Sequence, residues 1–209
     1  MKFIYPAKIP VFPLSGVIYF PKTNLPLNIF EQRYLNLVDD VLKTNKLMGM
    51  IQPKNNHGVY KVGCLGKISD YKKSEDGRIL VNLTGLIRFE IKNEVDNKEL
   101  YREFNVEYEK FSQDLIESKD LNFNDFDLPA LFKKIKSFFK KNGLLLNWSE
   151  FEKLELEQQI NTLAMVAPIS NEEKQKLLET ITIEEKSRVL SEIIEFYIHE
   201  KNIDNITIQ

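Results

Sequence analysis

The segment Ile9–Tyr34 constrains the fold of this chain more than any other part of its sequence. Its 26 positions hold four prolines, one glycine and a dense set of apolar residues. Proline fixes φ, lacks an N–H group and pushes the preceding residue toward extended conformations, so the segment divides into short pieces. The apolar pieces are rich in β-formers and too short for helices. We therefore predict strands at Ile9–Phe12, Val17–Phe20 and Leu25–Ile29.

The rest of the first half combines one helix with further strands. An apolar spacing of three to four residues predicts a helix over Glu31–Thr44, and Leu47–Ile51 is an apolar run suited to a buried strand. From Tyr60 to Tyr108 the apolar period is two residues, which indicates antiparallel strands with one buried face. Asp76-Gly77-Arg78 carries the signal of a tight hairpin turn, and Gly85 allows a bulge or bend in the strand that follows.

The second half of the chain has the apolar period of helices. We predict one helix over Leu128–Lys141 and a longer one that runs from the capping signals near Asn147 to about Val166. Ser170 and Thr182, each followed three residues later by glutamate, open two more helices through capping boxes. These patterns predict a bundle of about four helices.

Composition and charge exclude several classes of protein. Hydrophobic residues make up 43% and charged residues 29% of the chain, as in soluble globular proteins, and no apolar run reaches the ~18 residues of a membrane span. The N-terminus lacks the apolar core of a signal peptide, and the single cysteine cannot form an internal disulfide. We therefore expect a cytoplasmic protein with no membrane partner. Residues 1–110 hold 17 basic and 13 acidic residues and residues 111–209 hold 12 and 18, which indicates a change of architecture near residue 110.

The sequence holds no recognisable catalytic or metal-binding constellation. His57, His199 and Cys64 have no metal-ligand spacing. The phosphate-loop signature, the Rossmann glycine pattern and the Gly-x-Ser-x-Gly elbow are absent. Cys64 is explained as a buried core residue and His199 as a residue that interacts with the end of a helix, so neither needs a catalytic role. We therefore expect no catalytic residue, no cofactor and no metal.

Short blocks of distinctive sequence follow the opening segment in order. The opening segment closes on Ile29-Phe30-Glu31-Gln32-Arg33-Tyr34, and the later blocks are Val62–Ile68, Asp76-Gly77-Arg78, Leu83–Phe89 and Tyr101-Arg102. Together they resemble the substrate-binding (LON) domain that stands at the N-terminus of ATP-dependent Lon proteases and on its own in some bacterial proteins. The helical pattern near the end of the chain resembles the end of the same domain, so the resemblance covers about residues 9–198.

The resemblance implies an α+β fold. Its first part would be a mixed, partly closed, barrel-like (PUA-like) β-domain with one helix, and its second part a helical bundle. We place the β-rich subdomain at residues 1–112, the helical subdomain at residues 122–200 and a mobile tail at residues 201–209. Full Lon proteases carry an ATPase module and a Ser–Lys protease module after this domain, and the sequence stops at Gln209, before either would begin. We therefore expect no ATP hydrolysis, no proteolysis and no other enzymatic activity from this chain alone.

The family motif also suggests a surface that contacts polypeptide. Phe30, Arg33 and Tyr34 match the opening motif, and Arg88-Phe89 matches a later block. The resemblance implies that these side chains contact extended or unfolded polypeptide. A structural interpretation is open for all of them. Phe30 and Tyr34 would join the helix to the sheet while the neighbouring charged side chains pair locally, and Phe89 would be a core residue beside a strand arginine.

Two functions from different classes are consistent with these patterns. The first is a non-catalytic module that binds unfolded or partly folded polypeptide, as an adaptor in protein quality control that works with a protease or a chaperone. The second is an RNA- or ribosome-associated module that uses the basic, PUA-like β-half. Salt separates them, because binding to phosphates weakens steeply as salt rises whereas apolar recognition does not.

Overall fold

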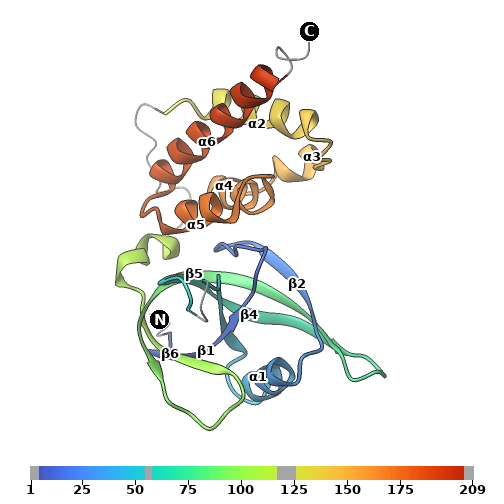
Figure 1. Ribbon diagram of the computed structural model, residues 1–209, viewed down its shortest axis with the longest axis vertical. Helices are drawn as coiled ribbons and strands as arrows, with labels where there is room; N and C mark the ends of the chain where they lie inside the picture. The colour runs from blue at the N-terminus through green and yellow to red at the C-terminus, as the bar shows by residue number, and fades with distance from the viewer. Residues whose placement is uncertain (1–4, 55–57, 117–125, 205–209) are drawn as a thin grey trace. The chain divides into compact units, whose positions relative to one another are not determined.

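The computed structural model describes residues 5–54, 58–116 and 126–204, with side chains described as far as His199. The chain forms two compact units, Met1–Leu115 and Ile116–Gln209. Strands are the main elements of the first unit and helices those of the second (Figure 1). The predicted α+β fold is confirmed.

The first unit is built on one six-stranded mixed sheet. Its strands are β1 (Lys8–Pro13), β2 (Asn24–Ile29), β3 (Leu47–Ile51), β4 (Val62–Lys73), β5 (Ile79–Val95) and β6 (Arg102–Glu107). β1 pairs parallel with β3 and antiparallel with β6, and the antiparallel pairs β3–β4, β4–β5 and β5–β6 close these strands into a ring. β2 pairs with the first part of β5. The added strand and the one parallel pair make this a barrel-like sheet and not a regular barrel.

β5 pairs with β2 near its start and with β6 near its end because it bends in the middle. Opposite Leu65 and Gly66 of β4, the strand contains one extra residue, Leu86. A Cβ atom at Gly85 would lie 2.3 Å from the carbonyl oxygen of Phe20, so only glycine allows this close approach of two backbone segments. The bend predicted at Gly85 is confirmed.

The opening segment supplies β1, β2 and the approach to α1 (Gln32–Leu42), and α1 lies within the predicted helix. The helix packs through the apolar face that the sequence pattern predicted: Tyr34, Leu37, Val38 and Val41. Figure 1 shows α1 lying beside the curved strands. A 3₁₀ segment, η1 (Glu109–Leu115), follows β6 and packs against β5.

The strand predicted at Val17–Phe20 is wrong. The segment is not part of the sheet, although Ile18, Tyr19 and Phe20 are buried in the core. A turn follows immediately, because the Thr23 hydroxyl donates to the carbonyl oxygen of Phe20 at 2.6 Å. The apolar residues of this segment therefore fill the interior without forming a ladder, and composition alone cannot distinguish these two outcomes.

The second unit contains five helices among the residues that the structure describes. They are α2 (Leu128–Lys141), α3 (Trp148–Phe151), α4 (Leu156–Val166), α5 (Asn171–Glu179) and α6 (Ile183–Asp204). α6 packs against α2, α4 and α5 (Figure 1). The predicted bounds of α2 and the capping box at Ser170 are confirmed. Within the described ranges, no helix has both the length and the apolar character needed to cross a membrane.

The single helix predicted from Asn147 to Val166 is instead two helices. The chain turns after Phe151, and the side-chain amide of Gln159 donates to the carbonyl oxygen of Leu154 at 2.9 Å, in the turn between α3 and α4. At the other end of the unit, α6 continues to Asp204, past the start of the predicted tail, and residues 205–209 lie outside the described residues.

Candidate functional site

A groove of about 580 Å³ opens in the first unit where several element ends and connecting segments meet. It is bounded by the end of β1, the first turn of α1, the segment that follows β3 and the segment that joins β5 to β6. Its lining combines apolar and aromatic side chains with two arginines: Tyr34, Val59, Leu100, Tyr101, Arg33 and Arg102. Because its lining comes from separate parts of the chain, the groove exists only in the folded unit.

The first turn of α1 supplies one wall of the groove. The Arg33 side chain donates to Oε2 of Glu31 at 3.0 and 2.7 Å, and its guanidinium carbon lies 4.6 Å from the ring centroid of Tyr34. The Tyr34 ring packs edge-on against Phe12, with the centroids 4.0 Å apart. Burial raises the pKa of the Tyr34 phenol, which therefore stays neutral at physiological pH. The Tyr34 ring is only 6% exposed, so this wall consists of a largely buried ring with the Arg33 guanidinium stacked on it.

The segment between β5 and β6 supplies another wall. Arg102 donates to both carboxylate oxygens of Glu94, each at 2.7 Å, and these hydrogen bonds hold the pKa of Glu94 below its usual value. The guanidinium carbon of Arg102 also lies 4.9 Å from the ring centroid of Phe104. Leu100 keeps 63% of its surface exposed. An exposed leucine beside a fixed arginine is suited to contacting a partner.

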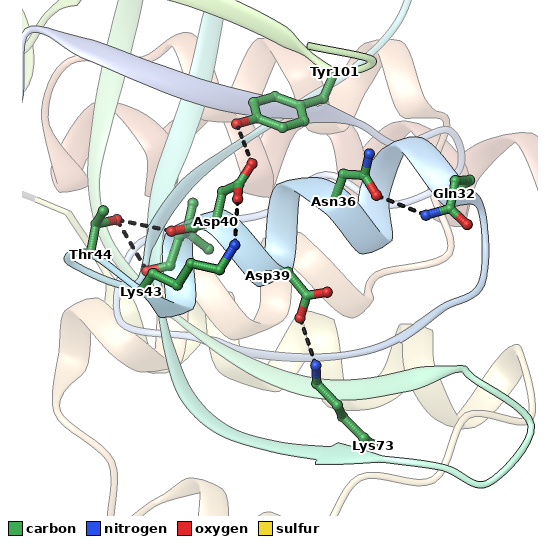
Figure 2. A network of polar contacts seen from close by, with 9 residues as sticks. Gln32, Asn36, Asp39, Asp40, Lys43, Thr44, Lys73 and Tyr101 are labelled. Carbon is green, nitrogen blue, oxygen red and sulfur yellow. Dashed lines mark hydrogen bonds and ion pairs between the residues drawn. The ribbon is translucent and has the colours of Figure 1, made fainter.

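A polar network ties this segment to α1 (Figure 2). The Tyr101 hydroxyl donates to Oδ2 of Asp40 at 3.1 Å, across 61 positions of sequence, and Lys43 donates to Oδ1 of the same carboxylate at 3.0 Å. The pKa of Asp40 is lowered, chiefly by the hydrogen bond from Lys43. Lys73 donates to Asp39 at 2.7 Å and ties α1 to the end of β4. The network therefore holds two walls of the groove in a fixed relation.

The predicted site residues fall into two groups. Arg33 and Tyr34 line the groove, and Phe30, just before the α1 N-cap, is 65% exposed but is not among the lining residues. Arg88 and Phe89 are only 2% and 0% exposed, so neither side chain can reach a bound polypeptide in this structure. Burial therefore favours the structural interpretation of Arg88 and Phe89, in which both side chains belong to the core.

Sequence reasoning did not single out Glu94, Leu100 and Arg102 as site residues. Tyr101-Arg102 was recognised as a family block, but nothing in the local pattern shows that this block lies against the first turn of α1. That proximity depends on the pairing of β1 with β6 and on the long-range bond from Tyr101 to Asp40.

The described residues contain no group of three or more His, Cys, Asp or Glu side chains that could hold a metal ion. His199 is exposed near the end of α6, Cys64 is buried within β4, and His57 lies outside the described residues.

A more open hollow of about 460 Å³, here named the sheet hollow, lies on β2, β4 and β5. Its apolar lining residues are Pro26, Leu27, Tyr71, Leu80 and Val81, of which Tyr71 and Leu80 are 45% and 46% exposed. It lacks paired cations stacked on rings, and we treat it as the competing location for any binding function.

Comparison with known proteins supports the resemblance. Residues 8–195 match the family described as the ATP-dependent protease La (LON) substrate-binding domain. A Lon protease of Dictyoglomus thermophilum is 24% identical over 87% of this chain, and one of Desulfosudis oleivorans is 31% identical over 42% of it. The chain spans 23% and 12% of the lengths of these two relatives.

Solved structures show the same fold. The Lon N-terminal domain protein from Xanthomonas campestris aligns with a TM-score of 0.62 at 20% identity, covering 88% of this chain and 96% of that one. The N-terminal domain of Mycobacterium avium complex Lon protease aligns with a TM-score of 0.63 at 15% identity, covering 90% and 98%. The chain therefore belongs to the LON substrate-binding domain family.

Proposed function

We propose that this chain is a non-catalytic module that binds unfolded or partly folded polypeptide in the groove beside α1. The observation that carries the proposal is the composition of the groove: an exposed leucine, Leu100, beside the rings of Tyr34 and Tyr101. Apolar segments of an unfolded chain lose water-exposed area on such a surface. Phe30, just before α1, is a further exposed apolar side chain, although it does not line the groove.

The cellular role that fits this site is an adaptor in protein quality control. The family description names a substrate-binding domain, and the relatives are Lon proteases. A recognition module of this kind delivers bound polypeptide to a protease or a chaperone. The chain's only cysteine, Cys64, is buried in β4, which suits the reducing cytoplasm.

The charge distribution favours polypeptide over RNA as the ligand. Nine basic side chains of the described part of the first unit lie in ion pairs with carboxylates: Lys8, Arg33, Lys43, Lys73, Arg78, Arg88, Lys92, Arg102 and Lys110. A phosphate ligand must compete with these carboxylates. RNA binding depends on many cations meeting phosphates, so the RNA alternative receives no specific support.

Fluorescence anisotropy of a labelled, permanently unfolded polypeptide tests the proposal. We expect saturable binding with little change between low and high salt, because apolar contact is not screened. Leu100→Ser should weaken this binding about tenfold, since burying a leucine stabilises a complex by about 1.5–3 kcal/mol and about 1.4 kcal/mol is tenfold in Kd.

The matched control is Leu145→Ser, which alters a fully exposed leucine in the second unit. It should leave Kd unchanged, and both variants should unfold like the original chain, as surface substitutions generally do. If the two variants lose affinity equally, the polypeptide does not bind specifically in the groove. Absence of any binding would refute the proposed function.

A further inference from the structure

A second hollow of about 430 Å³ adjoins the groove along the segment between β5 and β6. The two hollows share Glu94, Leu100, Tyr101 and Arg102 in their linings. A polypeptide segment that covers Leu100 can therefore extend into both hollows, one on each side of the shared residues.

The two hollows differ in the charged side chains that line them. Glu94 and Arg102 neutralise each other and belong to both linings. Beyond this pair, the groove adds the cation of Arg33, whereas the second hollow adds the carboxylates of Asp96 and Glu99.

Other charges nearby do not reverse this difference. Glu31 binds Nε and Nη2 of Arg33 at 3.0 and 2.7 Å but is absent from the groove lining, so an acidic side chain in the groove shares the guanidinium with Glu31 through its remaining N–H donors. Lys98, which lies between Asp96 and Glu99 in sequence, lines neither hollow. The structure describes no ion pair for Asp96 or Glu99, and both are exposed. A basic side chain of a bound segment can therefore pair with them without displacing a cation of this protein.

We propose that this surface, once it binds polypeptide as described above, selects extended segments with a particular charge pattern. An apolar residue covers Leu100, an acidic residue on one side lies toward Arg33, and a basic residue on the other side lies toward Asp96 and Glu99. The inference rests on the proposed function and specifies its substrate class.

The test uses labelled peptides that share one apolar centre and differ only at two flanking positions. The flanks are two residues before and two residues after the central residue, because side chains at alternate positions of an extended chain share a face. The four peptides carry one acidic and one basic flank, two acidic flanks, two basic flanks, or two serines. The peptides are compared by the charges of their two flanks and not by the order of the flanks, so the result does not depend on the direction in which a peptide binds.

The peptide with one acidic and one basic flank should bind about fivefold tighter than the serine peptide at low salt, because exposed ion pairs contribute modestly at each end. The peptides with two acidic or two basic flanks should bind less tightly than the peptide with one flank of each charge. High salt should remove the preference while leaving the serine peptide bound, since screening acts on charges and not on apolar contact.

Arg33→Glu should switch the preference to the peptide with two basic flanks. The variant should fold, because a carboxylate is favourable in the first turn of a helix. Arg78→Glu is the matched control: the Arg78 side chain is 53% exposed, like that of Arg33, and pairs with an acidic residue two positions earlier, but it lies outside both hollows.

The outcomes separate the two proposals. If all four peptides bind equally, the charge preference is overturned while polypeptide binding stands. If Arg33→Glu leaves the order of the peptides unchanged, Arg33 does not set the preference and the inference is wrong. If no peptide binds, the proposed function fails and the inference fails with it.

Discussion

Replacing Asp114 with alanine is expected to destabilise the first unit by about 3–5 kcal/mol, because it leaves a buried guanidinium without its carboxylate. Arg88 and Asp114 are 2% and 3% exposed. Asp114 accepts hydrogen bonds from the Arg88 side chain at 2.6 and 3.0 Å and from its backbone N–H at 2.9 Å. The Arg88 guanidinium also lies 4.4 Å from the ring centroid of Phe111, so the pair joins η1 to β5.

Hydrogen exchange of the β4 and β5 amides in the full chain measures this loss, because it reports on opening of the first unit separately from the second. Asp76→Ala provides the control, since it breaks the exposed pair with Arg78 and should cost at most about 1 kcal/mol. The double variant Arg88→Met/Asp114→Leu should recover much of the stability, because apolar side chains can replace a buried ion pair. An Asp114→Ala variant as stable as Asp76→Ala would contradict this role.

Phe89→Ala is expected to have a similar effect, about 3–5 kcal/mol, because it removes a fully buried ring and leaves a cavity. The ring occupies space that two glycines leave open. A Cβ atom at Gly49 would lie 3.0 Å from the ring, and one at Gly63 would lie 2.6 Å from it. The glycines and the phenylalanine therefore form one packing unit, and truncating the ring leaves a cavity beside both glycines.

This variant also decides between the two interpretations of Phe89. Denaturant unfolding gives the loss of stability, and anisotropy gives the affinity of the fraction that remains folded. We expect a large change in the first and none in the second. A stable Phe89→Ala protein that no longer binds unfolded polypeptide would restore Phe89 as a contact residue.

Local sequence patterns predicted the parts of the fold whose structure depends on near neighbours. The hairpin at Asp76-Gly77-Arg78, the helix Leu128–Lys141 and the capping box at Ser170 are examples, because turn, apolar period and cap are each encoded within a few residues. Val17–Phe20 was assigned wrongly because pairing, and not composition, distinguishes a strand from a buried extended segment.

The residues of the candidate site also divide into those that local sequence predicted and those that contacts between distant segments position. Arg33 and Tyr34 were predicted because they lie in the opening motif, and they line the groove. Arg88 carries a charge, which suggests exposure, but its partner Asp114 lies 26 positions away and allows it to be buried. Leu100 stayed outside the prediction because its position depends on strand pairings between distant segments.

The location of polypeptide binding is most directly tested by mapping amide chemical-shift changes in the isotope-labelled chain as an unfolded polypeptide is added. Binding in the groove should give changes that cluster around residues 33–34, 58–59 and 94–102. Leu100→Ser should reduce these changes together. Changes centred instead on Leu27, Tyr71 and Leu80 of the sheet hollow, or on the helices of the second unit, would contradict binding in the groove.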